Sequence, residues 1–472
     1  MANEVAKTCA AYDGMQPGWK LPRTLMAGTR GMRSAGRMYL PQEPAESDKA
    51  YVNRLSRSTL FNAYKRTVGG ITGKVFSKDI VLGDDVPEEM ADWSEDVDLM
   101  GRNLANFSRD VFKDGLQTGL SYILVDMPSG EAPKNKAAEK ELNRRPYFVH
   151  IKAEDMIGWK TETVHGKETL AQIRFREIAT VADGEFGEKT QERIRVMWRD
   201  RYEVWVKVET KTATDEEWAI DPEQSGVVSL GEIPLAVFYA ARTGFMTAEP
   251  PLEDLAYLNE AHWQSASDQR HILHVARVPI LFGRMLKGTD EAGNQIEIGP
   301  NRMVASEDKD GDLKYVEHAG AGIDAGRQDL LDTEDRMRVM GLEMYMPKSG
   351  TQTATGKAID SAEQNSVVKT MALSLKDTLE QAFVYMAKWA GLKDGGSVIV
   401  NTDYLAMTGQ MAHEVTALFN MRMAGEVSQS TFWAEMVRRG VFMDDFNAEA
   451  EQEALGEEAP GLGGIGVDGD DE

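Results

Sequence analysis

The order of elements predicted for residues 250–391 constrains this chain more than any other feature. A helix begins after Pro250-Pro251 in the segment PPLEDLAYLNEAHWQSASDQRHILHVARVP. A polar insert follows, then a second helix in IDAGRQDLLDTEDRMRVMGLEMYM, a polar loop PKSGTQTATG and a very long helix that reaches Gly391. The stretch contains no recognisable set of catalytic residues. We therefore expect two helices joined at one end by a small β insert, followed by a long helix against the rest of the fold. This arrangement does not indicate the pocket of an enzyme.

The insert between the first two helices carries its own turn signals. The sequences DEAGN at 290–294 and DKDG at 308–311 separate short apolar runs. Turn residues at this spacing predict a small β module. Because its two ends lead into the two helices, we expect those helices to lie close to one another.

The last helix of this stretch has the clearest period in the chain. Its apolar positions are spaced by three and four residues, as in an amphipathic helix: Val368, Ala372, Leu375, Leu379, Phe383, Met386 and Ala390. At 1.5 Å per residue a helix over 355–391 would extend about 55 Å. Gly391 and the pair Gly395-Gly396 end it.

The N-terminal block predicts a mixture of helices and antiparallel strands. We expect helices over 46–77, within 87–100 and near 104–117, and a buried strand in LSYILVDMP. Between 147 and 240, the runs YFVHI, LAQIRFRE, RIRVMWR, RYEVWVKVE and LAVFYA alternate apolar and polar residues. This alternation is typical of an antiparallel sheet with one face open to water. The fold class is therefore α+β.

The C-terminal part predicts one more strand in SVIVNTDY and helices within 409–440. From Val441 to Glu472 the chain has eleven acidic residues and no Lys or Arg. Such a composition predicts a disordered tail.

Length and charge limit the class of protein. A chain of 472 residues is expected to form two or more domains. No apolar run approaches the ~20 residues of a membrane span, and the start MANEVAKTCA has no apolar signal core, so we expect no export. Cys9 is the only cysteine, which rules out an internal disulfide. The net charge of −24 argues against a protein that grips nucleic acid through a broad basic face.

The stretch 250–391 resembles the portal proteins of tailed bacteriophages, which form a ring at one capsid vertex through which DNA is packaged and ejected. The segments that carry the resemblance are DLAYLNEAHWQSASDQR, GRQDLLDTEDRMRVMGLE and TATGKAIDSAEQNS. YLPQEPAESDKAYVNRLSRSTLFNAYKRTVGGITGKVF and STFWAEMVRRGVF resemble other parts of the same proteins. The likeness covers roughly residues 35–455, and it lies in the order of the segments and in their residue composition.

The resemblance implies a portal-type fold with an α/β wing, a two-helix stem, a small β clip, a long wing helix and a helical crown. The corresponding ranges are 1–250 for the N-terminal wing, 251–277 for stem helix 1, 278–320 for the clip, 321–346 for stem helix 2, 347–358 for the tunnel loop, 359–405 for the long wing helix and strand, 406–440 for the crown and 441–472 for the acidic tail.

The resemblance also implies partners and a place in the virion. We expect a homo-oligomeric ring of twelve subunits, double-stranded DNA passing through it without sequence specificity, and no membrane. The packaging motor (large terminase), the major capsid and scaffolding proteins, and head-completion or tail adaptor proteins would bind the ring. It would assemble in the host cytoplasm and reside at the portal vertex. An acidic lumen suits a conduit, because phosphates held by many cations would not slide.

The expected DNA-channel residues lie in the predicted tunnel loop. They are Lys348, Ser349, Thr351, Gln352, Thr353 and Lys357. The two lysines would touch phosphates transiently. No catalytic residue, metal site or cofactor is expected, and the chain is predicted not to be an enzyme.

The same loop supports a rival hypothesis. Gly350-x5-Gly356-Lys357 resembles a phosphate-binding loop before a helix. Such a loop has four residues between its glycines and Ser or Thr after the lysine, whereas this one has five, and Ala358 follows. A nucleotide-using enzyme with an atypical phosphate loop is therefore one alternative function. Another acidic virion scaffold or adaptor protein is a second.

Three metal-like patterns fall short of a site. His271 and His274 could share a helix face with Asp268, but helical residues at this spacing more often pack or face solvent. The pair His413-Glu414 lacks the second histidine of a zinc-protease motif. The aspartates from position 308 begin like a calcium loop that lacks its glycine and final glutamate, so a hairpin turn is the better interpretation.

Aromatic residues at 198–205 interleave with arginines, as in a platform that stacks nucleic-acid bases. Alternation on a half-buried sheet explains the same pattern without a ligand.

Overall fold

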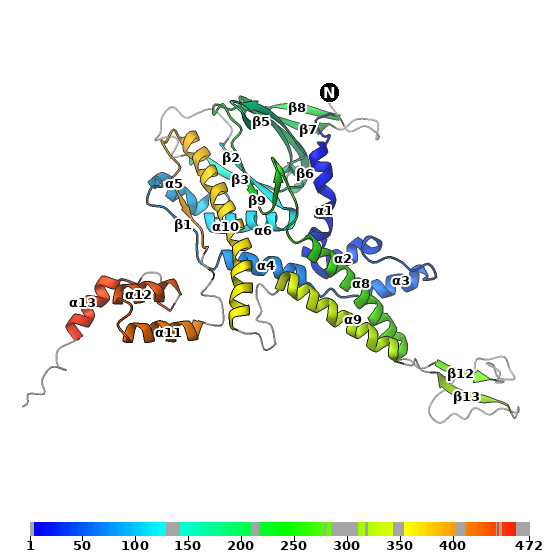
Figure 1. The fold of residues 1–472 in the computed structure, drawn as a ribbon. Coiled ribbons are helices and arrows are strands. Elements are labelled where there is room, and N and C mark those ends of the chain that lie inside the picture. The colour runs from blue at the N-terminus through cyan, green and yellow to red at the C-terminus, as the bar shows by residue number, and fades with distance from the viewer. Residues whose placement is uncertain are drawn as a thin grey trace, which may run out of the picture. The chain divides into compact units, whose positions relative to one another are not determined.

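The computed structural model describes residues 4–128, 142–208, 217–277, 280–284, 310–316, 320–342, 354–402, 404, 411–439, 441–442 and 446–458. These residues form two compact units, Met1–Val400 and Asn401–Glu472. Helices and antiparallel sheets are mixed in the first unit (Figure 1), so the predicted α+β class is confirmed.

The first unit opens with helices that surround the base of the sheets. They are α1 (Ala10–Met26), α2 (Gly28–Ala35), the 3-10 turn η1 (Gly36–Met38), α3 (Asp48–Arg57) and α4 (Ala63–Val75). The single helix predicted over 46–77 is wrong, because the chain breaks between α3 and α4. Ser58 ends α3 in an extended conformation, and the Asn62 side chain caps α4 by accepting from the backbone N–H of Lys65 at 2.9 Å.

A second helical group follows the short strand β1 (Val81–Leu82). It comprises α5 (Glu88–Trp93), η2 (Ser94–Asp96) and α6 (Leu104–Thr118). Asn103 caps the start of α6, and Gly119 ends it in the left-handed region with φ +89°. The predicted helix near 104–117 is confirmed.

A three-stranded antiparallel sheet forms the centre of the unit. Its order is β3 (Tyr147–Ile151), β2 (Leu120–Asp126) and β9 (Leu235–Tyr239). One face meets α6 and the long helix α10, because Phe148 contacts Phe107 of α6 and Phe383 of α10. The other face, with Tyr122 and Leu124, joins the core of the larger sheet. Burial on both faces explains why β2 has a continuous apolar sequence.

The larger sheet is a five-stranded antiparallel meander. Its strands, in spatial order, are β4 (Gly158–Val164), β5 (Lys167–Asp183), β6 (Gly187–Trp198), β7 (Arg201–Val208) and β8 (Glu217–Val227). The register pairs Ile194 with Trp205 and Arg195 with Val204, so the buried side chains of Ile194 and Val204 lie on opposite faces of the sheet. The predicted antiparallel sheet is confirmed, but where β6 meets β7 buried residues lie on both faces rather than on one. Two shorter strands, β10 (Arg242–Gly244) and β11 (Thr247–Ala248), lead into the next helix.

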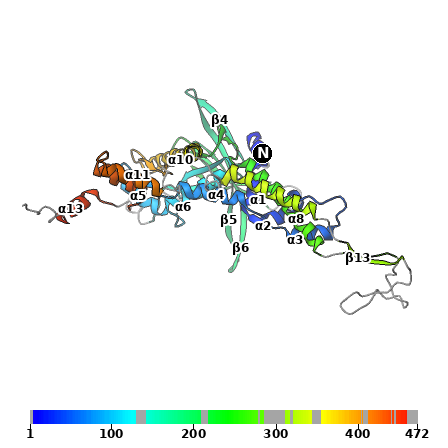
Figure 2. The same cartoon turned by 60° about the horizontal axis from the view of Figure 1, so that its bottom comes forward.

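Two helices then extend away from the sheets and end at a β ribbon. They are α8 (Glu253–Ala276) and α9 (Ala321–Met337), and α9 continues into the π-helical turn η3 (Arg338–Leu342). The ribbon pairs β12 (Ile280–Arg284) with β13 (Asp312–Val316) antiparallel. Figure 1 and Figure 2 show α8 and α9 side by side, with the two strands at their far end.

The long helix α10 (Ala354–Ala390) crosses the unit and packs against β9 and β2. Six of the seven residues in its predicted apolar stripe are buried, and Ala390 is half-buried. Gly391 ends the helix with φ +68°. The short strand β14 (Val398–Ile399) pairs with β1.

The second unit contains α11 (Met411–Met423), α12 (Gln429–Arg438) and α13 (Ala448–Glu458). Helix α13 falls in the segment predicted to be disordered. Its sequence is rich in Ala and Glu, which favour helix. Just before it, Phe446 lies 5.8 Å from Trp433 of α12 and stacks on Phe442. Residues 459–472 lie outside the described part of the chain.

Candidate functional site

Helices α8 and α9 form an antiparallel pair that polar side chains join. Three contacts form a ladder along the pair: His262 Nε2 to Glu334 Oε1 at 3.2 Å, Ser265 Oγ to Asp329 Oδ2 at 2.9 Å, and Gln269 Nε2 to the Ile323 carbonyl at 2.8 Å. Close approach is possible because Gly326 faces Gln269, whose Oε1 would lie 2.3 Å from a Cβ at that position. The expectation that the two helices lie together is confirmed.

Much of this helical hairpin is uncovered. On α8, α9 and η3, the large apolar side chains of Tyr257, Leu331, Val339 and Met340 are all exposed. An open groove of about 630 Å³ lies at the base of the hairpin, lined by Asp254, Tyr257, Leu258, Asp335, Arg336, Val339 and Met340. Exposed apolar residues grouped in this way are typical of a surface that another protein covers.

A buried asparagine fastens the base of the hairpin to α4. Asn259 is fully buried, accepts from the backbone N–H of Tyr64 at 3.0 Å and donates to the Phe61 carbonyl at 2.8 Å. Tyr64 lies in the first turn of α4, where a backbone N–H has no helical partner, and Phe61 lies in the break just before that helix. Gly341 of η3 lies against the same region, where a Cβ would meet Leu255 at 2.5 Å and Thr67 at 2.7 Å.

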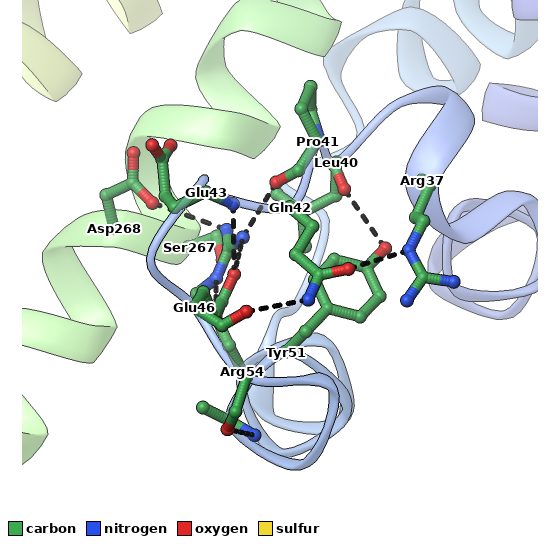
Figure 3. Close-up of polar contacts among 12 residues, drawn as sticks. Arg37, Leu40, Pro41, Gln42, Glu43, Glu46, Tyr51, Arg54, Ser267 and Asp268 are labelled. Carbon is green, nitrogen blue, oxygen red and sulfur yellow. Dashed lines mark hydrogen bonds and ion pairs between the residues drawn. The ribbon is translucent and has the colours of Figure 1, made fainter.

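A buried arginine fastens the middle of the hairpin to α3 (Figure 3). Arg54 is only 4% exposed. Its guanidinium donates to both carboxylate oxygens of Glu46 at 2.9 and 2.8 Å, and to the Pro41 carbonyl at 2.8 Å. The remaining nitrogen faces α8, 3.4 Å from Asp268 Oδ1 and 3.5 Å from Ser267 Oγ. We call these five residues the Arg54 cluster.

The electrostatics of the Arg54 cluster follow from these contacts. The hydrogen bonds from Arg54 lower the pKa of Glu46, and Glu46 in turn raises the pKa of the guanidinium. Burial raises the pKa of Asp268, although the charge of Arg54 opposes this. The bidentate Arg54–Glu46 pair is therefore the firm contact, and Asp268 is the weaker link to the hairpin.

A second buried polar group contains the residue types of a catalytic triad. Ser121 Oγ donates to Asp114 Oδ2 at 2.9 Å and lies 2.8 Å from His150 Nε2. In a triad the carboxylate holds the other ring nitrogen of the histidine. Here Asp114 Oδ2 lies 3.6 Å from the same Nε2, and Ser121 is fully buried. The single proton of Ser121 goes to Asp114, so the arrangement serves packing between α6 and the central sheet.

Arg23 completes this buried group. It bonds Asp114 Oδ1 at 2.5 Å, Gln117 Oε1 at 2.8 Å and the Glu154 carboxylate. Burial alone would raise the pKa of Asp114, but contact with His150 and the charge of Arg23 lower it.

The channel residues expected from the sequence cannot be assembled into a site. Lys348, Ser349, Thr351, Gln352 and Thr353 lie outside the described residues. Lys357 lies in the first turns of α10, where the backbone alone is described. What the structure does place is the two ends that hold this segment, η3 and α10. The residues that sequence reasoning missed are Asn259 and the Arg54 cluster, because their partners are far apart in the chain.

The arginines of the larger sheet are engaged within it. Arg195 pairs with Asp126 at 2.5 Å and Glu177 at 3.0 Å. Arg201 stacks on the Trp198 ring, 4.2 Å from its centroid. These contacts favour the structural explanation of the arginine and aromatic pattern over a platform for bases.

Metal ligands do not gather in the parts of the chain that the structure describes, where no group of three or more His, Cys, Asp and Glu residues could hold an ion. Among the described helices, none is long and apolar enough to cross a membrane.

A family model described as "Domain of unknown function (DUF4055)" matches residues 251–390, the stretch from α8 to the end of α10. No curated protein matches the chain.

Three solved structures resemble it. One is "Virion of native gene transfer agent (GTA) particle", with 10% identity, a TM-score of 0.41 and coverage of 80% of this chain and 89% of that one. Another is "Neck of empty GTA particle computed with C6 symmetry", with 12% identity, a TM-score of 0.42 and coverage of 80% of this chain and 89% of that one. A third is "Neck of native GTA particle computed with C12 symmetry", with 12% identity, a TM-score of 0.40 and coverage of 86% of this chain and 99% of that one.

Proposed function

We propose that this chain is a phage portal protein, which forms a ring at one capsid vertex and serves as the conduit for DNA packaging and ejection. The observation that carries the proposal is the order α8, β ribbon, α9, η3 and α10. An antiparallel hairpin with a β ribbon at its tip returns to a 37-residue helix that is anchored on the sheets. This is the order of stem, clip, stem and wing helix in the family that the sequence resembles.

The surface of the hairpin supports a ring. A pair of helices joined by polar contacts, with apolar side chains uncovered, does not form a core by itself. In a closed ring each hairpin would pack on a neighbour through a heterologous contact, so that one surface covers another all the way round. The groove beside Tyr257, Val339 and Met340 is a surface that such a neighbour would cover.

The roles of the parts follow from this proposal. The hairpin would line the conduit, and the loop with Lys348 and Lys357 would face passing DNA. The ribbon end would receive the packaging motor and later the head-completion or tail proteins. The sheets and outer helices would meet capsid protein at the portal vertex. No catalytic step and no cofactor are assigned to the chain, since the motor would hydrolyse ATP.

The mass of the assembled particle tests the proposal. Light scattering on a sizing column is expected to give several hundred kilodaltons, against 52.3 kDa for one chain, and negative-stain images are expected to show closed rings. A monomer at every salt and protein concentration would contradict it. Filaments or irregular clusters would favour another acidic virion scaffold or adaptor.

An ATPase assay separates the proposal from the nucleotide enzyme. The purified chain is expected to hydrolyse no ATP, and Lys357→Ala is expected to leave ring formation intact while it changes DNA packaging modestly. Hydrolysis above background that disappears in Lys357→Ala would restore the enzyme hypothesis. Lys376→Ala, on the described part of α10, is a matched control.

A further inference from the structure

Charge is distributed very unevenly along the first helices. Residues 20–78 contain twelve Lys and Arg but only three Asp and Glu, in a chain whose net charge is −24. Residues 79–101 contain nine Asp and Glu and no Lys or Arg. The two segments are consecutive, so the chain passes directly from a basic to an acidic stretch.

The basic segment presents an exposed face, which we call the basic face: Arg30, Lys49, Val52, Arg57, Lys65 and Arg66. Lys49, Val52 and Arg57 project from the outer side of α3, which no described element covers. Among the described residues, none of the five cations of the face makes an ion pair. Cations without a partner in their own chain leave this side of α3 able to contact a surface of opposite charge.

Internal contacts make the basic face a firm surface. The Arg33 guanidinium donates to the Ser58 carbonyl at 2.8 Å, which ties α2 to the end of α3. Asn62 donates to the Leu25 carbonyl at 2.7 Å, which ties the start of α4 to the end of α1. The Arg54 cluster holds α3 on α8 from behind. The helices that carry the exposed cations are therefore tied to one another and to α8.

The acidic segment presents a second face, which we call the acidic face: Val81, Asp84, Glu88, Glu89, Asp92, Glu95, Met100 and Ile399. Its apolar members are strongly exposed, at 54% for Val81, 81% for Met100 and 57% for Ile399. Behind them Met90 is fully buried, and Arg145 anchors η2 through the Asp96 carbonyl. The acidic face is thus built like the basic one, with exposed apolar side chains among charges of one sign.

The two faces lie at opposite ends of the unit. Figure 1 and Figure 2 both show α5 at one end and α2 and α3 at the other, and Figure 1 shows β1 beside α5. Within one copy they cannot meet. In a second copy related by a rotation, the acidic face of one chain can meet the basic face of the next.

We infer that the acidic face of one copy docks on the basic face of the next copy, and that this contact sets the head-to-tail order of the ring. The inference rests on the proposed function, since it names the interface of the proposed ring. Faces of opposite charge attract, whereas two like faces repel, so the contact joins two different faces, and its repetition by rotation gives a head-to-tail order. The exposed valines, methionine and isoleucine supply the apolar centre, and the charges surround it.

Charge reversal tests the contact. In one variant Arg57→Glu and Lys65→Glu lower the charge of the basic face from +5 to +1, and in another Glu88→Lys and Asp92→Lys change the charge of the acidic face from −5 to −1. A third variant carries all four changes. The matched controls reverse exposed residues of the larger sheet, Lys160→Glu with Lys189→Glu and Glu168→Lys with Glu185→Lys. Sizing with light scattering gives the protein concentration at half-assembly, and circular dichroism checks that each variant is folded.

Each single-face variant is expected to need roughly tenfold or more protein for half-assembly, because most of the charge attraction at the contact is lost. An equimolar mixture of the two single-face variants is expected to assemble better than either one alone, because half of its contacts then join an unaltered acidic face to an unaltered basic face. The variant with all four changes is expected to need the most protein, because both of its faces have lost most of their charge. The control variants are expected to match the unaltered chain. Raising salt from 0.05 to about 0.5 M should weaken the unaltered ring more than the variants, because screening removes charge attraction.

The outcomes distinguish a failure of the proposed contact from a failure of the proposed ring. If the unaltered chain forms rings and the single-face variants assemble as well as the controls, the interface is wrong and the proposed ring stands. If the unaltered chain stays monomeric, both fail. If the basic face variant assembles normally but loses binding to duplex DNA that the unaltered monomer has, the basic face is a nucleic-acid surface and the inference is overturned.

Discussion

Replacement of Arg54 by alanine gives the sharpest test of the structural argument. Arg54 and Glu46 are close to buried, with side chains 5% and 10% exposed, and their charged atoms are 2.8 Å apart. The same region contains a second pair, Arg37 and Asp48, at 2.7 Å, whose side chains are 61% and 83% exposed. The two pairs have the same chemistry and nearly the same distance, so they differ mainly in burial.

The expected magnitudes differ by several fold. Without Arg54, the Glu46 carboxylate keeps a single backbone donor, the N–H of Glu43 at 3.3 Å. Removing one partner of a buried pair leaves a charge that water reaches only in part, which costs up to about 3–5 kcal/mol. The Pro41 carbonyl also loses its donor, which adds to the cost. Arg37→Ala removes an exposed pair, whose free energy is about 0–1 kcal/mol.

Urea titration with circular dichroism measures the free energy of unfolding for Arg54→Ala, Arg37→Ala and the double variant Arg54→Met with Glu46→Leu. The double variant is expected to recover most of the loss, because no buried charge is left unpaired. Hydrogen exchange should show the loss of protection first in α3 and in the part of α8 near Asp268. If Arg54→Ala costs no more than Arg37→Ala, or if the double variant is worse than the single one, the reasoning from burial is refuted.

Three further predictions follow from single contacts. Asn259→Leu is expected to lower the free energy of unfolding by about 1–3 kcal/mol in urea titration, since the buried N–H of Tyr64 loses its partner while the Phe61 carbonyl keeps the N–H of Ala63. Gly119→Ala is expected to cost at least about 1–2 kcal/mol in the same assay, because φ is +89° and a Cβ would lie 2.4 Å from the Glu249 carbonyl oxygen. The lowered pKa of Glu46 contributes stability that is present above its unfolded pKa and is lost as pH falls through the folded pKa. Stability measured from pH 7 to pH 3 should therefore fall below about pH 4.5, and Glu46→Gln should flatten that slope.

Elements with a strong local period could be predicted from the sequence. The apolar stripe of α10, the double-sided burial of β2 and the alternation in β6 are each visible in a short window. Helix α1 was missed because Pro17 and Pro22 argue against a helix there. It is held by contacts with distant residues, such as the Trp19 indole N–H that donates to the Thr118 carbonyl at 2.9 Å. Strand β8, with DPEQSG in its sequence, was missed because its neighbour β7 rather than its own propensity makes it a strand.

Features of the site that depend on nearby residues could likewise be predicted from the sequence, whereas features that depend on distant residues could not. The polar surface of α8 and α9 could be predicted, and so could their adjacency, because the insert between them has to return. The Arg54 cluster could not, since Glu46 is eight residues from Arg54 but Asp268 is 214 residues away. The break between α3 and α4 is of the same kind. Ser58 leaves the helical path because its hydroxyl meets Ser267 of α8 at 2.8 Å, a contact that no local pattern reveals.

The separation of charge along the first helices depends both on the local sequence and on the folded structure. The counts for 20–78 and 79–101 can be read from the sequence, but they do not say whether the two stretches neutralise each other or face apart. Helix α4 decides this, because its thirteen residues carry the chain roughly 20 Å from the basic end toward the acidic end. Stretches that are consecutive in sequence are thereby placed at opposite ends of one rigid unit. A copy of the chain can then satisfy its neighbour's charges but never its own, which is the arrangement that the proposed head-to-tail contact requires.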